Sequence, residues 1–585
     1  MAEEICSINC LPNEIISLIL QKNNGRDILR FGATCRRFNE FVKSNQYLWK
    51  DITKRSLPDH LYKILEEHCD GNWLNELKGF NTVQKQVYVN LCAMSPQFYG
   101  QDSDVSIQDV RPFFKVALQS RFSFNYSICI LQELIRKGNI IVDEGKKVRK
   151  PYTLTEMHYA RIVLRHLIHT FLSLKWVRAH MGNELPPEIV CNFFIQWIDT
   201  IAMHPDEDVD SKIADLVERV KLILEEKRGT KSLEDVPREK MVVDREVLAA
   251  VTQVVYRQRH MAVTTAANLD TLDIVRVLNT KVGNVIVVTA IYQAVAKKCG
   301  VNCELIAFPN HLFLEWRDNS DPKNPQVFTV DPTSGELNRR RRCPFSQNGP
   351  ATNYRYCPDS LLQYICSSFH MSMGAIRNCN TYNALHLLDF LGTNLNTPTS
   401  YRNFLPYLLD QTHLSAMNAP LNLEHLSAVH MEIIKSLSSL VVPSECAKKR
   451  FSVKRHGGNV KYAVGMTCYH NKYDYVCIIR GWDAQCALKW QCQMAAESLY
   501  FGVTQPFYNV IAVDQSERYV PQENLQDLAR PTRMYHLEDV IATEFTHFDG
   551  FAYVPNDEKR AEFPEDEAIV NVYRERHQLL SETDD

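Results

Sequence analysis

The sequence predicts a multidomain α+β protein with an N-terminal unit of three helices, a largely helical middle that holds an α+β core, and a C-terminal small antiparallel β-barrel. Three observations predict this fold class. The chain has 585 residues, enough for about two to four domains. Apolar residues recur with helical spacing through most of residues 11–440. From residue 464 onward, short apolar runs separated by turns are typical of strands.

The first expected helix begins near Pro12, a residue that fits the first turn because it needs no hydrogen bond there. Leu11, Ile15, Leu18 and Ile19 fall on one side of this helix and form an apolar stripe. A unit of about forty residues cannot bury enough apolar surface to be stable alone. We therefore expect this stripe to dock on something, either within the chain or outside it.

Two more helices complete the N-terminal unit. Asp27 is expected to cap the second one. The third has Cys35 and Phe38 on its apolar side and Arg37 on its polar side. Leu48-Trp49 then closes the unit. Without further context, this is also what an ordinary three-helix fragment of a larger core looks like.

The order of these residues resembles the F-box, the motif that docks on the Skp adaptor of cullin-RING ubiquitin ligases. The resemblance implies a set of adaptor-binding residues. They are Leu11, Pro12, Glu14, Ile15, Ile19, Leu20, Ile28, Leu29, Cys35, Phe38, Leu48 and Trp49.

The middle of the chain combines a helix with strands. Gly283-Asn284 opens a helix that ends at Gly300, and strands follow at 303–308, 312–316 and 326–330. The strands carry His311 and deliver Asp331. A helix followed by strands with His and then Asp is the arrangement in which a thiol at the helix start attacks an acyl carbon, with His as base and Asp orienting it.

This section resembles the transglutaminase-like domain of the SirB1 type, over roughly residues 187–370. It departs from that pattern where the nucleophile belongs, because residues 284–288 contain neither Cys nor Ser. Cys299 lies about 15 Å away at the other end of the helix. We therefore expect no catalysis, with His311 and Asp331 as degenerate remnants. An acyl-transfer enzyme of the transglutaminase or protease type remains an alternative.

The strands from residue 464 resemble the family named for hemimethylated-DNA binding, whose bacterial members include the heat-shock protein Q. Candidate ligand-binding residues there are Tyr473, Trp482, Asp483, Trp490, Phe507 and Tyr508. Residues 460–525 hold five Lys or Arg and six Asp or Glu, so no positive stripe for a phosphate backbone is visible. Protein recognition is favoured, and DNA binding is kept as an alternative.

Composition limits the other function classes. The formal charge of -3 is nearly neutral, so nothing directs the whole chain to nucleic acid or membranes. The first ten residues lack a secretory signal and the longest apolar run is too short for a membrane span. We expect reduced cysteines, no metal, no cofactor, no membrane partner, and a cytoplasmic or nuclear location.

Together the three regions resemble the F-box only protein 21 family. This implies a non-catalytic substrate-recognition subunit of an SCF (Skp–cullin–F-box) ubiquitin ligase, with a Skp adaptor, a cullin and an unnamed protein substrate as partners. The expected regions are an F-box at 5–55, a helical connector at 56–150, the transglutaminase-like domain at 151–370, a helical block at 371–447, the barrel at 455–556 and a tail at 557–585.

Overall fold

The structure is a computed structural model of the 585-residue chain. It describes residues 8–100, 105, 109–138, 153–181, 185–201, 206–228, 240–308, 311–318, 326–339, 354–355, 357–373, 380, 383–384, 387, 452–455, 459–487 and 499–583. The chain forms two compact units. The first combines residues 1–167, 410–420 and 442–585, and the second holds residues 168–409 and 421–441. Most of the helical block expected at 371–447 lies outside the described residues.

Four short helices open the first unit, where the sequence predicts three. They are α1 (Asn13–Leu20), α2 (Gly25–Gly32), α3 (Arg36–Ser44) and α4 (Gln46–Ser56), after the 3-10 turn η1 (Ile8–Cys10). Leu48 and Trp49 lie on α4, because the Asn45 side chain caps a new helix by accepting from the Leu48 N–H at 3.1 Å. Asn24, rather than Asp27, caps α2.

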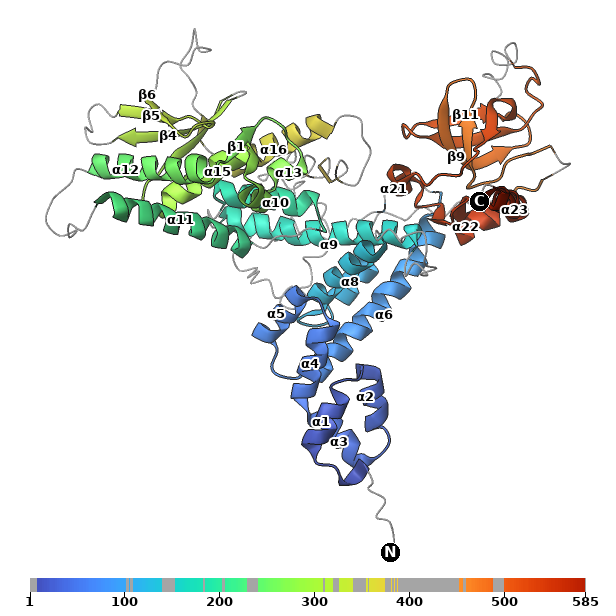
Figure 1. Ribbon diagram of the computed structural model, residues 1–585, viewed down its shortest axis with the longest axis horizontal. Coiled ribbons are helices and arrows are strands. Elements are labelled where there is room, and N and C mark those ends of the chain that lie inside the picture. Colours follow the sequence, from blue (N-terminus) through green and yellow to red (C-terminus); the bar gives the residue numbers. More distant parts are fainter. Residues whose placement is uncertain are drawn as a thin grey trace, which may run out of the picture. The chain divides into compact units, whose positions relative to one another are not determined.

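Further helices continue the first unit (Figure 1). They are α5 (Asp59–His68), α6 (Trp73–Phe98), α7 (Arg111–Ala117), α8 (Ser123–Gly138) and α9 (Leu154–Met181), and the boundary between the two units falls inside α9. Helix α6 contacts α4, α7 and α8. Its inward side is an apolar row that includes Leu77, Val83, Val87 and Leu91, so α6 is the central support of this helical region.

The C-terminal part of the first unit is a five-stranded antiparallel sheet. Its strands are β8 (Thr467–His470), β9 (Tyr475–Asp483), β10 (Phe507–Ala512), β11 (Glu517–Pro521) and β12 (Leu525–Asp527). The strand order is β11-β10-β9-β8-β12, and no pairing between β11 and β12 closes the sheet within the described residues. The expected closed barrel is therefore an open sheet, because local strand patterns do not specify which edges pair.

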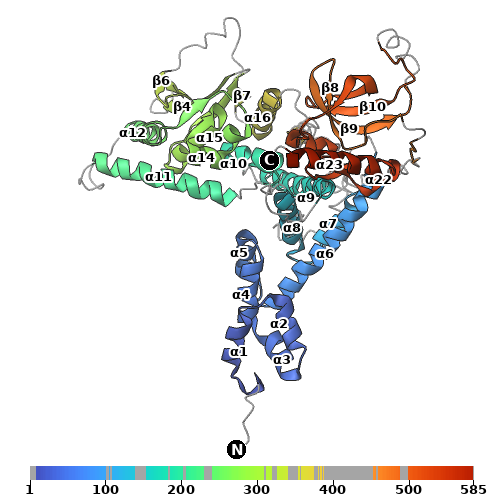
Figure 2. The same ribbon diagram turned by 45° about the vertical axis from the view of Figure 1, so that its right-hand side comes forward.

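Further elements complete this part of the chain. They are the 3-10 turns η6 (Gln522–Asn524) and η7 (Tyr535–Leu537), helix α21 (Glu538–Ile541), strands β13 (Phe545–Phe548) and β14 (Tyr553–Pro555), and helices α22 (Asp557–Glu562) and α23 (Asp566–Thr583). Figure 2 shows α22 and α23 beside the sheet. The hairpin β13–β14 meets the segment before β8 through the Tyr553 N–H, which donates to the Gly465 carbonyl at 2.8 Å. The expected tail thus forms two helices, and the Phe563 ring packs on Trp482 of β9.

Helices also dominate the second unit. They are α10 (Pro187–Ile198), α11 (Asp206–Arg228), α12 (Lys240–Thr252), the π-helical turn η2 (Gln253–Gln258), α13 (Leu269–Leu272), α14 (Ile274–Thr280), α15 (Val285–Lys298) and α16 (Pro358–Met373). Helix α15 is the core of this unit, because it contacts α10, α11, α12 and α14 and is almost entirely buried.

A second antiparallel sheet packs against α15 (Figure 1). Its strands are β3 (Glu304–Phe308), β4 (His311–Asp318), β5 (Gln326–Val330), β6 (Leu337–Arg339) and β7 (Tyr354–Arg355), in the order β6-β5-β4-β3-β7. The parallel pair β1 (Ala262–Thr264) and β2 (Val282–Asn284) leads into α15. Gly283 of β2 allows a close approach, since a Cβ atom there would lie 2.5 Å from a Val277 methyl group.

Candidate functional site

Four large apolar side chains are exposed on the first two helices. Ile15, Leu18 and Ile19 of α1 are 42%, 59% and 47% exposed, and Leu29 of α2 is 41% exposed. These side chains make up the apolar face of α1 and α2. Large apolar side chains that gather on one small module without burial mark a surface that binds another protein. The face agrees with the stripe predicted from the spacing of the apolar residues.

A buried core packs behind these exposed side chains. Ile16 and Leu20 point inward from α1, between the exposed positions. Trp49 is fully buried, and its Nε1–H donates to the Val42 carbonyl of α3 at 2.6 Å. The Asn45 amide donates to the Ser17 hydroxyl at 2.6 Å and so ties the start of α4 to α1. The face therefore belongs to a packed module rather than to an isolated helix.

The structure divides the expected adaptor-binding residues into two groups. Pro12, Glu14, Ile15, Ile19 and Leu29 are exposed, and Leu11 and Cys35 are half-buried. Leu20, Ile28, Phe38, Leu48 and Trp49 are buried within the module. The second group therefore forms the core that holds the exposed group in place, and its side chains are not available for direct contact.

Arg37 links α3 to the start of the chain. Its guanidinium Nη2 donates to the Leu11 carbonyl at 2.8 Å and to the Asn13 Oδ1 at 3.3 Å, and Nη1 donates to the Asn9 carbonyl. The helical pattern of the sequence places Arg37 on the solvent side. The sequence carries no local signal for these bonds, because their acceptors are backbone and side-chain oxygens 24 to 28 residues away.

In the second unit, Asn284 occupies the start of α15. Its Oδ1 accepts from the Ile286 N–H at 3.0 Å, and its Nδ2 donates to the Ala266 carbonyl at 2.9 Å. The side chain is buried and caps the helix. The nearest hydroxyl on the helix, that of Thr289, donates to the Val285 carbonyl at 2.6 Å. The start of the helix is therefore built for capping, with amide and hydroxyl groups committed to the backbone.

His311 and Asp331 lie at the same end of neighbouring strands. His311 opens β4, Asp331 follows β5, and the register pairs Leu314 with Val330. The Asp331 Oδ1 accepts from the N–H and hydroxyl of Thr333 and from the Ser334 N–H. Partial burial raises the pKa of Asp331, but these hydrogen bonds outweigh it and the pKa is lowered overall. The carboxylate thus stabilises its own turn.

Two cysteines at the C-terminal end of α15 and just beyond it are poor nucleophiles. Burial raises the pKa of the Cys303 thiol to about 12, and burial also raises the pKa of the Cys299 thiol at the C-terminal end of α15. A raised pKa keeps the thiol protonated at neutral pH. The described cysteines are free thiols except Cys486, which is disulfide-bonded and so differs from the expectation of reduced cysteines throughout.

The C-terminal sheet buries most of the aromatic residues expected to bind a ligand. Trp482, Phe507 and Tyr508 are core side chains. The Trp482 Nε1–H donates to the buried Asp566 carboxylate of α23 at 3.1 Å. Their ring faces are therefore occupied inside the unit, and they do not form a surface for a ligand. Trp490 lies outside the described residues.

Asp566 itself is the centre of a buried polar cluster. It accepts from the Arg455 guanidinium at 2.7 Å and from the Val464 N–H at 2.7 Å. The same guanidinium donates to the carbonyls of Val460 and Tyr462. The cluster joins the segment before the sheet to the last helix, so Trp482 serves the fold.

Two other expected residues remain near the surface. Tyr473 is 65% exposed, and its ring stacks on His470 with centroids 5.1 Å apart. His470 in turn stacks on Tyr475 at 4.6 Å, and the Arg518 guanidinium lies 4.1 Å from the centre of that ring. Asp483 accepts from the Tyr519 hydroxyl at 2.7 Å. Tyr473 is thus the exposed end of a stacked row.

Two arginines of this sheet are paired with acids. Arg480 bonds Glu517 and Glu544, each at 2.6 Å, and Arg518 bonds Asp514 at 2.6 Å. Paired guanidinium groups contribute little to attraction of a phosphate backbone, because their charge is already neutralised. The charge distribution therefore agrees with the balance of charges read from the sequence.

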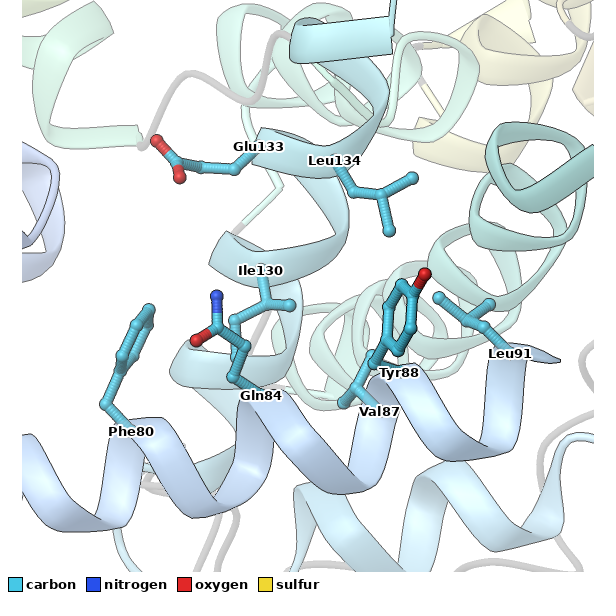
Figure 3. A pocket seen from close by; sticks show the side chains of 8 residues that line it. All are labelled: Phe80, Gln84, Val87, Tyr88, Leu91, Ile130, Glu133 and Leu134. Atoms are coloured by element: carbon cyan, nitrogen blue, oxygen red, sulfur yellow. The ribbon is translucent and has the colours of Figure 1, made fainter. Parts of the chain in front are cut away.

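A shallow pocket lies between α6 and α8 (Figure 3). Its lining residues are Phe80, Gln84, Val87, Tyr88, Leu91, Ile130, Glu133 and Leu134. Its volume of ≈ 30 Å³ has room for about a water molecule and none for an organic ligand.

In the residues that the structure describes, no group of acidic, His or Cys side chains is arranged to hold a metal ion. None of the described helices combines the length and apolar character that a membrane span needs.

Comparison with known families divides the chain into three matched regions. Residues 8–55 match the F-box-like family. Residues 207–348 match the transglutaminase-like superfamily, and residues 460–551 match the family described as hemimethylated DNA-binding protein YccV like. No solved structure matches the chain.

Curated relatives match over nearly the whole length. F-box only protein 21 of Pongo abelii is 24% identical over 99% of this chain and 97% of its own length. The Homo sapiens protein of the same name is 23% identical with the same coverage, and the Mus musculus protein is 23% identical over 96% of this chain and 94% of its own. The three regions occur here within one full-length match.

Proposed function

We propose that this chain, a member of the F-box only protein 21 family with F-box, transglutaminase-like and YccV-like domains, is the substrate-recognition subunit of an SCF-type ubiquitin ligase. An F-box domain implies binding of a Skp-type adaptor. In the proposed role the F-box holds the adaptor, the adaptor joins the cullin, and the remaining domains hold a target protein. The chain supplies binding surfaces and no catalytic residue.

The apolar face of α1 and α2 carries this proposal. Ile15, Leu18, Ile19 and Leu29 remain exposed on a module whose core is otherwise well packed. Exposed aliphatic side chains favour binding because a partner removes their apolar area from water, by roughly 25 cal/mol for each Å² buried. A helical adaptor that covers this face would remove from water the apolar side chains that the module itself leaves exposed.

The transglutaminase-like domain fits a binding role better than an acyl-transfer role. Acyl transfer through a covalent intermediate needs an activated nucleophile beside its base. The start of α15 instead holds Asn284, whose amide is committed at both ends to the backbone. Asp331 is engaged by Thr333 and Ser334 in its own turn. We therefore infer that this domain contributes a scaffold or a binding surface.

The C-terminal sheet fits protein recognition better than DNA binding. Arg480 and Arg518 are neutralised by neighbouring acids, and Trp482, Phe507 and Tyr508 are not accessible for stacking on bases. Tyr473 remains as an exposed aromatic side chain. At physiological salt, the full chain should bind duplex DNA weakly, with no preference for hemimethylated sites, in a fluorescence anisotropy titration. Tight, salt-sensitive binding that is lost in Lys472→Ala would favour the DNA-binding alternative.

The adaptor proposal is tested with the full chain and a purified Skp-type adaptor by isothermal titration calorimetry. Ile15→Asp or Leu18→Asp should weaken binding at least about 30-fold, because each places a charge in an apolar interface. Leu222→Asp is the matched control, since Leu222 is 58% exposed on α11 and lies outside the F-box-like region. Equal binding by wild type and both F-box variants would refute the assignment of this face.

A further inference from the structure

The Arg37 side chain reaches three acceptors that lie on both sides of the start of α1. The Asn9 carbonyl belongs to η1, the Leu11 carbonyl belongs to the two residues between η1 and α1, and the Asn13 Oδ1 belongs to the first residue of α1. A planar guanidinium has five N–H donors in a fixed fork, so it can fix several oxygens at once. Arg37 therefore fastens residues 9–13 to α3.

A gain in the stability of α1 does not explain why the positively charged Arg37 side chain lies beside the start of this helix. The N-terminus of a helix carries a partial positive charge, so a neighbouring guanidinium is electrostatically unfavourable there. The first turn of α1 holds one acidic residue, Glu14, as a partial compensation. Arg37 is also exposed, so it adds little buried area. Its contacts are best explained by the geometry that they impose on the segment before α1.

That segment borders the apolar face of α1 and α2. Leu11 is half-buried, Pro12 is exposed, and Ile8 is 46% exposed. Two backbone hydrogen bonds hold this segment locally, from the Leu11 N–H to the Ile8 carbonyl at 3.3 Å and from the Ile16 N–H to the Pro12 carbonyl at 3.2 Å. A segment with so few local contacts would lose conformational entropy when a partner orders it.

We infer that Arg37 is a positioning residue for adaptor docking: it holds Leu11-Pro12 in line with the exposed positions of α1 before the adaptor binds. This inference rests on the proposed function, because it assigns a role at the same surface. Preorganisation of this kind raises affinity by lowering the entropic cost of binding, without a direct contact between Arg37 and the adaptor.

The test measures adaptor binding by the full chain carrying Arg37→Ala. We expect about a ten-fold higher Kd, equivalent to the loss of one well-formed set of charge-assisted hydrogen bonds. Arg37→Lys should recover only part of the affinity, since an ammonium group cannot span the same acceptors. Arg55→Ala is the matched control, because it removes the same charge from an exposed position of the same module, where Arg55 pairs with Asp51.

A double-mutant cycle separates positioning from a general structural role. If Arg37 acts through Leu11, then Leu11→Ala and Arg37→Ala together should weaken binding little more than the stronger single change. Hydrogen exchange of residues 9–13 should rise in Arg37→Ala, while exchange within α3 stays unchanged. Additive losses in the cycle, or faster exchange throughout the module, would overturn the positioning role.

The outcomes also distinguish this inference from the proposed function. If the wild-type chain fails to bind the adaptor, the proposed function fails. If the wild type binds and Arg37→Ala binds equally well, the adaptor assignment stands and the role of Arg37 is wrong.

Discussion

Asn284 lies at the start of α15, where an acyl-transfer enzyme would need a nucleophile. Its amide accepts from the Ile286 N–H and donates to the Ala266 carbonyl, so one side chain pairs two backbone groups. A residue committed in this way contributes to stability rather than to catalysis. The sequence shows that a thiol is absent there, but only the structure identifies the carbonyl of Ala266 as the second partner.

Replacing Asn284 by Ala should destabilise the start of α15 by about 1 kcal/mol, since it removes a helix cap, while the Ala266 carbonyl keeps the Thr271 hydroxyl as a donor at 2.8 Å. Hydrogen exchange of the amides at 286–289 in the full chain measures this loss. Asn302→Ala, at an exposed position in the same unit, should change exchange little. Unchanged protection in Asn284→Ala would contradict the capping role.

For the C-terminal sheet, the sequence predicts which residues lie on strands but not which of their side chains are buried. The strand pattern correctly predicts that Trp482, Phe507 and Tyr508 lie on strands, but it does not tell a core face from a binding face. The deciding partner of Trp482 is Asp566, which lies 84 residues further along the chain. A charged residue in a polar stretch gives no local sign that it will be buried in an ion pair.

At the scale of elements, strands and helices with strong periodicity are predicted well. The strand expected at 326–330 is β5, and the helix opened by Asn284 is α15. Weakly amphipathic elements are predicted with less detail, and α6 extends from Trp73 to Phe98 within the region expected only as a helical connector at 56–150. The antiparallel sheet near the C-terminus is predicted, but its closure into a barrel is not seen in the part of the chain that the structure describes, because strand pairing is a long-range property.

The hairpin β13–β14 depends on a close approach at Gly465. This residue has φ +89°, and a Cβ atom there would lie 2.0 Å from the Tyr553 carbonyl oxygen. Gly465→Ala should therefore destabilise the unit by about 3 kcal/mol, through both backbone strain and overlap. Thermal unfolding of the full chain measures the change.

Gly502→Ala provides the matched control for this prediction. Gly502 also has a positive φ, of +60°, but the position that an alanine Cβ would take there has open space for 4 Å around it. Only the strain of the left-handed backbone conformation, about 1 kcal/mol, should remain. Equal losses for the two variants would show that the contact with Tyr553 is unimportant.

Glu544 connects the start of β13 with β9 and α22. It pairs with Arg480 at 2.6 Å and with Lys559 at 3.3 Å. Burial raises the pKa of Glu544, but the two cations outweigh burial and lower it below the ordinary value of 4.5. A lowered carboxyl pKa stabilises the folded state above pH 4.5, and this stabilisation is lost as the pH falls through the folded pKa.

Glu544→Gln should therefore lower the free energy of unfolding by about 3 kcal/mol at neutral pH. It should also make the loss of stability at acid pH less steep. The unfolding temperature of the first unit, followed from about pH 6 to about pH 3, measures both effects. Glu517→Gln removes the exposed partner of the same Arg480 and should leave the acid slope nearly unchanged. An unaltered slope in Glu544→Gln would exclude this carboxylate as its source.

At the scale of the whole molecule, the chain is divided into two units whose boundary falls inside α9. Chains with more than one compact unit commonly depart from two-state unfolding. Differential scanning calorimetry of the full chain should resolve two transitions. Asn284→Ala should lower one and Gly465→Ala the other, with effects that add within about 0.5 kcal/mol. A single transition shifted by both variants would contradict the division.

The sequence predicts the order of the three regions, but it does not predict this division. Contacts from the first helices to the last ones cross most of the chain, as where the Tyr99 hydroxyl donates to Glu562 at 2.6 Å and the Ser95 hydroxyl to Glu558 at 2.8 Å. Local periodicity contains no information about such distant partners.

The first unit is assembled from both ends of the chain, with residues 168–409 between its two main parts. During synthesis on the ribosome, its N-terminal helices leave the exit tunnel long before residues 442–585 exist. At a translation rate of about 5 to 20 residues per second, the delay is on the order of tens of seconds. The carboxylates of Glu558 and Glu562 thus reach their partners on and beside α6 only after a further 463 residues have been made. A nascent chain that stops before then leaves this surface of α6 uncovered.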